Sequence, residues 1–133
     1  MTKKNHLILA LIFFLAGILL SWYYRPFIYQ HKIFDLHIAD TLGNWIAIPS
    51  GINFAFYLKG FNQNLKLEIV KAVIIFILYE FIAYWGTFDY YDIIATIISG
   101  VGTYFLMKAL LKIKKLTSPR ELIVKSKLNE NPN

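Results

Sequence analysis

The chain has 133 residues, of which 57% are hydrophobic, and its apolar residues come in long blocks. This composition is too apolar for an ordinary soluble domain of this length, and it predicts one membrane domain with no soluble domain beside it. Cysteine is absent, which excludes disulfides, thiol catalysis and thiolate metal sites. The net charge of +6 does not indicate nucleic-acid binding, because the basic residues flank apolar blocks, where they set membrane orientation.

Four apolar segments follow one another along the chain. They cover residues 7–24, 42–58, 67–85 and 92–111. Each is close to the ~20 residues that a helix needs to cross the hydrocarbon core. We therefore predict an all-α, polytopic membrane protein whose domain, residues 1–116, is a bundle of four transmembrane helices.

The first segment, Leu7 to Tyr24, contains no charge and follows Lys3 and Lys4. A secretory signal peptide begins in the same way, so cleavage is the alternative interpretation. The sequence Ser-Trp-Tyr-Tyr-Arg-Pro follows, however, instead of an Ala-x-Ala-like cleavage site. We expect the segment to be retained as a membrane helix.

The second segment contains several polar or helix-breaking residues, so a re-entrant loop is the alternative there. The distribution of charge favours a full span. With four spans, all of the 14 Lys and Arg except Arg25 and Lys32 fall on one side of the membrane. Because basic residues concentrate in cytoplasmic loops, we predict that both termini are cytoplasmic in a multi-pass protein of a bacterial cytoplasmic membrane.

Small residues recur along the second and fourth segments. They are Gly43, Ala47, Gly51 and Ala55 at four-residue spacing, and Ala95 and Ser99. Such residues let helices approach closely in lipid, and we favour packing within one chain over packing between chains. Pro49 predicts a kink in the second segment, since it lacks a backbone donor. Asn44, Ser50 and Asn53 are candidates to satisfy the loosened backbone.

Residues 117–133 form a basic tail. Ser118 and Glu121 fit a capping box, and Pro119 fits the first helical position. Apolar and basic residues occur together there, as in helices that lie on a membrane surface; they are Leu122, Ile123 and Leu128 with Lys125 and Lys127. We predict a short cytoplasmic interfacial helix and contact with membrane lipids.

Five acidic residues gather at the predicted outer end of the bundle. They are Asp35, Asp40, Glu80, Asp89 and Asp92. Glu80 lies inside an apolar run, where a carboxylate is costly and therefore needs an explanation. Candidate partners from the first outer loop are Arg25, His31, Lys32 and His37. An internal tie between that loop and the third helix, and a ligand-binding role, both remain open for Glu80.

Asp89 and Asp92 flank the start of the fourth segment. Asp89 is placed to cap that helix, and Asp92 falls in its first turn, where a negative charge suits the helix dipole. Capping alone can account for one of the two. Thr87 is a further hydrogen-bond donor for the same turn.

No motif for metal binding or catalysis is present. His31 and His37, with Asp35 and Asp40, match no standard zinc spacing, so we predict neither a metal nor another cofactor. The sequence has no glycine-rich phosphate loop, nucleophile elbow or His-Glu-x-x-His motif. An enzyme is therefore the less favoured interpretation.

One stretch carries a family resemblance. It reads Gly86-Thr87-Phe88-Asp89-Tyr90-Tyr91-Asp92, preceded by Glu80 and followed by an apolar helix containing Gly100. This pattern resembles the signature of VanZ-like membrane proteins, and the similarity covers about residues 66–108. Asp40 and Asn44 fall where such proteins often carry an Asp and a His at the start of the second helix. The family's turn arginine is absent, because Gly86 passes directly to Thr87.

The resemblance implies a small four-helix accessory or binding protein of the cell envelope, linked to glycopeptide susceptibility. Its ligand would be a cell-wall precursor or a lipid-linked envelope component. The predicted outer polar site comprises Arg25, Asp40, Asn44, Glu80, Thr87, Asp89 and Asp92. The alternative function is a homo-oligomeric pore or small transporter, with Glu80 in the path of the permeating ion.

Overall fold

The computed structural model describes residues 1–60, 64–82 and 89–116. These residues form four helices and no strand: α1 (Lys3–His31), α2 (Leu42–Lys59), α3 (Leu65–Ile82) and α4 (Tyr90–Leu116). The prediction of an all-α chain with four helices is confirmed. The predicted interfacial helix of the tail and Thr87 lie outside the described residues.

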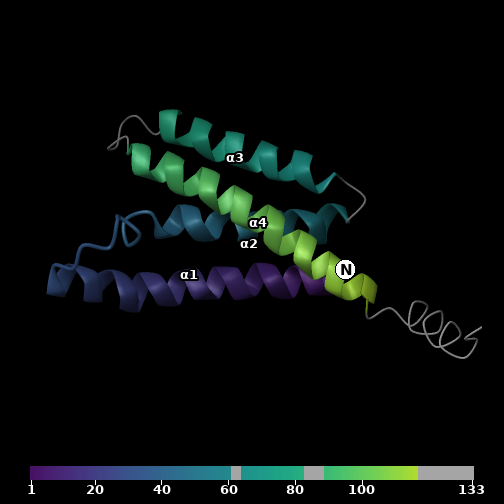
Figure 1. Cartoon of the computed structure of the whole chain (residues 1–133), viewed down its shortest axis with the longest axis horizontal. Coiled ribbons are helices and arrows are strands. Elements are labelled where there is room, and N and C mark those ends of the chain that lie inside the picture. The colour runs from purple at the N-terminus through teal and green to yellow at the C-terminus, as the bar shows by residue number, and fades with distance from the viewer. Residues whose placement is uncertain (61–63, 83–88, 117–133) are drawn as a thin grey trace, which may run out of the picture.

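The helices run alternately up and down (Figure 1). α1 packs chiefly on α2, while α2, α3 and α4 each contact the other two. The start of α1, the end of α2, the start of α3 and the end of α4 therefore share one end of the bundle. We call this the N-terminal end. The opposite end holds the segment between α1 and α2 and the start of α4, and we call it the loop end.

Two helices extend well past the predicted apolar segments. α1 covers Lys3–His31 where we expected residues 7–24, and α4 ends at Leu116 where we expected residue 111. Capping interactions at its two ends explain where α1 begins and ends. The Thr2 hydroxyl accepts from the amide of Asn5 at 3.3 Å. Lys32 closes the helix with a left-handed backbone, φ 50°. The apolar block thus marks the part suited to hydrocarbon, whereas caps decide where the helix ends.

α2 continues as a helix through Pro49. Proline cannot donate to the carbonyl four residues earlier, which is that of Trp45. Ser99 of α4 supplies the missing donor, since its hydroxyl lies 2.8 Å from the Trp45 carbonyl oxygen. Asn53 Nδ2 donates to the Pro49 carbonyl at 2.8 Å. This is the predicted role of Asn53, which is to satisfy a backbone group near the proline. Ser50 instead donates to the carbonyl of Ala10 in α1, at 3.1 Å.

The core lies where α2, α3 and α4 meet. It comprises Ile48, Ile52, Phe56, Ile69 and Met107. Polar side chains are also buried at the helix contacts. They are His6, Thr41, Asn53, Glu68, Thr96, Ser99 and Thr103. An interior of this mixed kind suits a bundle whose helices associate through packing and hydrogen bonds as well as through burial of apolar surface.

Close helix approach occurs at glycines other than those in the predicted stripe. Gly43 and Gly51 are exposed, and a Cβ added at either would meet nothing within 4 Å. A Cβ at Gly100 would lie 2.5 Å from Val73 Cγ2, and one at Gly17 would lie 2.9 Å from Ile46 Cγ2. α3 therefore packs on Gly100, and α2 packs on Gly17. Small residues at four-residue spacing indicate a face that another helix could approach closely. The spacing does not show whether a helix packs on that face.

The remaining members of the predicted packing set divide between the inside and the surface. Ala95 and Ser99 of α4 are buried, whereas Ala47 and Ala55 of α2 are half-buried. Ala47 lies with Gly43 and Gly51 along a shallow groove between α1 and α2. The stripe on α2 thus borders this groove instead of a third helix.

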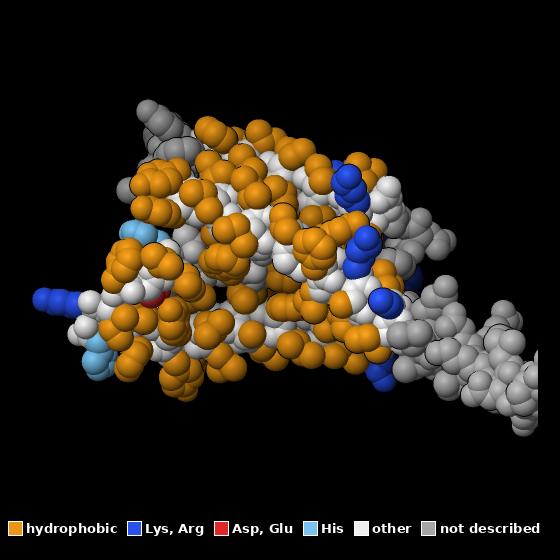
Figure 2. Space-filling model, viewed as in Figure 1, with side chains coloured by type: hydrophobic (Ala, Val, Ile, Leu, Met, Phe, Trp, Pro, Cys, Tyr) orange, Lys and Arg blue, Asp and Glu red, His pale blue; other side chains and the backbone are white. Residues whose placement is uncertain are grey.

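Apolar side chains cover the outside of the molecule between its two ends. Figure 2 shows them over most of the visible face, with lysine and arginine side chains mainly toward the N-terminal end. Many apolar side chains along α1 are about half exposed, among them Ile12, Phe14, Leu15 and Leu19. By length and composition, α1 and residues Tyr90–Ile113 of α4 could cross a membrane. α3 carries Lys66, Glu68, Lys71 and Glu80, but these lie near its two ends.

Candidate functional site: the carboxylates of the loop end

Those residues of the predicted outer site that the structure describes lie at the loop end of the bundle. The up-and-down order brings the last turns of α1 and α3 beside the first turns of α2 and α4 (Figure 1). Arg25 comes from α1, Asn44 from α2, Glu80 from α3 and Asp92 from α4. Residues far apart in the sequence are thereby gathered in one region.

The start of α4 is organised by its two aspartates. Asp89 Oδ1 accepts from the amide of Tyr91 at 2.8 Å, and the Asp89 carbonyl accepts from the amide of Asp92 at 3.2 Å. Asp89 therefore caps the helix, because its side chain satisfies an amide that has no partner within the helix. Asn44 Nδ2 donates to the Asp92 carbonyl at 3.2 Å, which ties the first turn of α2 to that of α4.

Glu80 lies in the last turn of α3 and is half-buried. It is near enough to Asp92 and Asp89 for the three negative charges to interact. Asp92 also interacts with Asp40. No ion pair or side-chain hydrogen bond involves the Glu80 or Asp92 carboxylate within the described part of the chain. The site is thus a group of like charges, and no cation of the described chain is bonded to the Glu80 or Asp92 carboxylate.

Arg25 is a cation close enough to this group to attract Asp92. Its hydrogen bonds go elsewhere, however. Arg25 Nε donates to the Ala39 carbonyl at 3.0 Å, and Nη2 donates to the Asp40 carbonyl at 2.9 Å. Arg25 therefore fixes the backbone of the loop between α1 and α2. Its hydrogen bonds do not reach Glu80, for which Arg25 was one of four candidate partners.

That loop has its own network. Asp35 Oδ2 accepts from the Ala39 amide at 2.7 Å and from the Tyr24 hydroxyl at 3.2 Å. Asp40 accepts from the Tyr29 hydroxyl and from His37 Nδ1, the latter at 3.2 Å. The hydrogen bond from Tyr29 is the main cause that lowers the pKa of the Asp40 carboxyl below its usual value.

The loop contacts α4. The imidazole of His37 stacks on the Tyr91 ring, with centroids 4.1 Å apart and planes 17° from parallel. His31 is directed into its own helix, since its Nδ1 lies 2.9 Å from the Phe27 carbonyl oxygen. Across the described ranges, no three His, Cys, Asp or Glu side chains are grouped closely enough to hold a metal ion.

A buried pair of polar residues and a buried carboxylate at the N-terminal end were not predicted as sites. His6 Nδ1 lies 3.0 Å from Asn53 Oδ1, and both side chains are buried. Glu68 is buried between two lysines, with Lys71 Nζ at 2.9 Å and Lys59 Nζ at 4.0 Å. The signal for the first pair is a polar residue just before the first apolar segment and another within the second. Sequence alone does not show that these two residues face one another.

Comparisons with protein-family models, with curated proteins and with solved structures give no match. The VanZ-like interpretation therefore rests on the motif between Glu80 and Gly100, part of which lies outside the described residues.

Proposed function

We propose that this chain is a four-span membrane protein with both termini in the cytoplasm. Two observations support the additional spans. On the face seen in Figure 2, apolar side chains cover other helices as well as α1. With four spans, all of the 14 Lys and Arg except Arg25 and Lys32 fall on one side of the membrane. In this orientation the N-terminal end, which is rich in lysine, faces the cytoplasm, and the loop end faces outward.

We further propose that the loop end is a binding site for a cationic or donor-rich polar group of the cell envelope. The observation that carries this proposal is the proximity of Glu80, Asp89 and Asp92 without a cation bonded to their carboxylates in the described chain. Like charges held together at the edge of hydrocarbon are costly, and a positively charged ligand would relieve that cost.

A buried hydroxyl supports the same location. Thr96 follows Asp92 by four residues, so the two side chains share a face of α4. Thr96 is fully buried, and its Oγ1 has no hydrogen-bond partner among the described residues. Polar groups buried without a partner are rare, and a bound ligand or water would satisfy this one.

The chemical class of ligand follows from the site. Amino groups of lipid headgroups or of peptide-bearing cell-wall precursors supply both positive charge and several donors. The resemblance of residues 66–108 to VanZ-like proteins fits such an accessory role in envelope assembly and glycopeptide susceptibility. In the alternative, Glu80 lines a pore between several copies. The interaction of Glu80 with carboxylates of its own chain favours the binding site instead.

The test of the site uses Glu80→Gln and Asp92→Asn, each of which keeps the shape of the side chain and removes its charge. We expect both to change the sensitivity of the host cell to antibiotics that act on the envelope, at unchanged protein level. Asp35→Asn is the matched control, because Asp35 lies at the same end and has its own hydrogen-bond partners. Wild-type sensitivity in both site variants would reject the proposal.

The topology has an independent test, since the chain has no cysteine. Single cysteines introduced at Gln30 and Asn64, both exposed, report their side of the membrane to a reagent that does not cross it. We expect labelling of Gln30→Cys from outside intact cells and of Asn64→Cys only after permeabilisation. Outside labelling of Asn64→Cys would overturn the orientation.

A further inference from the structure

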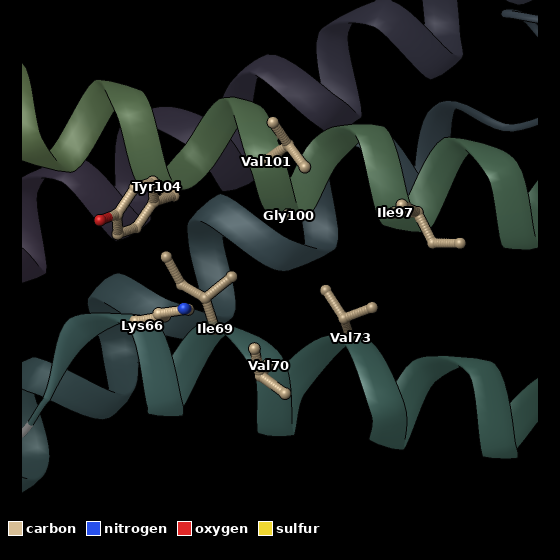
Figure 3. Close-up of a pocket in the computed structure, with 8 residues that line it drawn as sticks. All are labelled: Lys66, Ile69, Val70, Val73, Ile97, Gly100, Val101 and Tyr104. Carbon is tan, nitrogen blue, oxygen red and sulfur yellow. The ribbon is translucent and has the colours of Figure 1, made fainter.

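A groove of about 350 Å³ runs between α3 and α4 on the outside of the bundle. Figure 3 shows its lining, with Ile69, Val70 and Val73 from α3 opposite Ile97 and Val101 from α4. The glycine that allows the two helices to approach, Gly100, also lines it. The groove is therefore apolar along most of its length.

One end of the groove is polar and basic. Lys66 and Tyr104 lie together at that end, as Figure 3 shows. Lys108 adds a second ammonium group, which lies 5.0 Å from the centre of the Tyr104 ring. Lys66 begins α3 and Lys108 is near the end of α4, so both belong to the N-terminal end of the bundle.

These two lysines differ from others at the same end. Lys59 and Lys71 are engaged with the buried carboxylate of Glu68. Neither Lys66 nor Lys108 forms an ion pair with any carboxylate in the described ranges. An apolar groove that ends at two uncompensated ammonium groups is complementary to a molecule with a long apolar chain and an anionic head.

We propose that this groove binds one anionic phospholipid of the cytoplasmic leaflet. The phosphate lies at Lys66 and Lys108, and an acyl chain lies along the groove toward Val73 and Ile97. From Lys66 to Val73 the helix rises roughly 10 Å, at ~1.5 Å per residue, which is about two-thirds of one leaflet of a ~30 Å hydrocarbon core. The proposal shares the membrane orientation of the proposed function but uses a different surface and different residues.

The test is native mass spectrometry of the whole purified chain in mild detergent, titrated with phosphatidylglycerol or with phosphatidylcholine of the same acyl chains. We expect phosphatidylglycerol to bind more tightly. The double variant Lys66→Ala with Lys108→Ala should remove this preference. Each lysine should account for about a fivefold difference in affinity, the size expected for one charge at an anionic surface. Val70→Phe, which fills the groove, should weaken the binding of both lipids.

Matched controls separate a discrete site from general attraction to negative charge. Lys3→Ala with Lys4→Ala removes two exposed lysines at the same end of the bundle, and Leu67→Phe enlarges an exposed α3 residue that does not line the groove. Both controls should bind phosphatidylglycerol as the wild type does. Equal binding of the two lipids by the wild type, or equal losses in the Lys3/Lys4 control, would overturn the proposal. If Val70→Phe does not fold, the lysine variants still decide the question.

A failure of this lipid site is distinguishable from a failure of the acidic site. Glu80→Gln should leave phosphatidylglycerol binding unchanged, because Glu80 lies at the loop end. The lysine variants should leave the antibiotic phenotype of the acidic site unchanged for the same reason.

Discussion

The carboxylates at the two ends of the bundle have opposite electrostatic surroundings. At the N-terminal end Glu68 is buried between Lys71 and Lys59. At the loop end Glu80 and Asp92 lie near each other, and no cation of the described chain bonds to either carboxylate. A buried charge with its counter-ion serves the fold, whereas charges left without one are available to a ligand. The contrast distinguishes a carboxylate bound by lysines of its own chain from the carboxylates proposed to bind a ligand, which composition alone does not.

The largest effect on stability is expected at the buried pair of the N-terminal end. Asn53→Leu removes the hydrogen bonds of Asn53 with His6 Nδ1 and the Pro49 carbonyl. We expect the free energy of unfolding in detergent to fall by about 2 to 4 kcal/mol, since each buried polar group left unsatisfied costs about 1–3 kcal/mol. The measurement is a denaturation curve in mixed micelles. An unchanged curve would mean that this pair is not structural.

Neutralising one carboxylate at each end tests the comparison directly. Glu68→Gln should lower the free energy of unfolding by about 1 kcal/mol, a modest amount because both lysines are largely exposed. Glu80→Gln should be neutral or stabilising, because it relieves repulsion from Asp92 and Asp89. The same unfolding assay measures both. A larger loss in Glu80→Gln than in Glu68→Gln would reverse the roles assigned to the two ends.

The smallest expected effect concerns the loop between α1 and α2. Because the pKa of Asp40 is lowered in the folded chain, its contribution to stability is fully present above the ordinary carboxyl pKa. That contribution is lost as the pH falls through the folded pKa. We therefore expect the loop to become more accessible to hydrogen exchange under acid conditions. Asp40→Asn should remove part of this acid dependence, and an identical pH profile in the variant would contradict the assignment.

The number of helices could be predicted because long apolar blocks have few alternatives in a membrane. Helix ends could not, since Thr2 and Lys32 terminate α1 through hydrogen bonds that leave no trace in hydropathy. The site residues were chosen by their polarity at one end of the bundle. The partners of these residues were harder to predict. Arg25 shows why, because a guanidinium can donate to backbone carbonyls as well as to carboxylates.

The hydrogen bond from Ser99 to the Trp45 carbonyl has a consequence for how α2 and α4 are aligned. In lipid, two apolar helix faces can slide past each other at little cost, because hydrocarbon surrounds every position equally well. Pro49 creates a single carbonyl that needs an outside donor, and Ser99 reaches it at 2.8 Å. Moving α4 by one residue would rotate that hydroxyl by about 100° and leave the carbonyl unsatisfied. Pro49 and Ser99 together therefore fix the alignment of α4 along α2, and with it the position of Asp92 relative to α2.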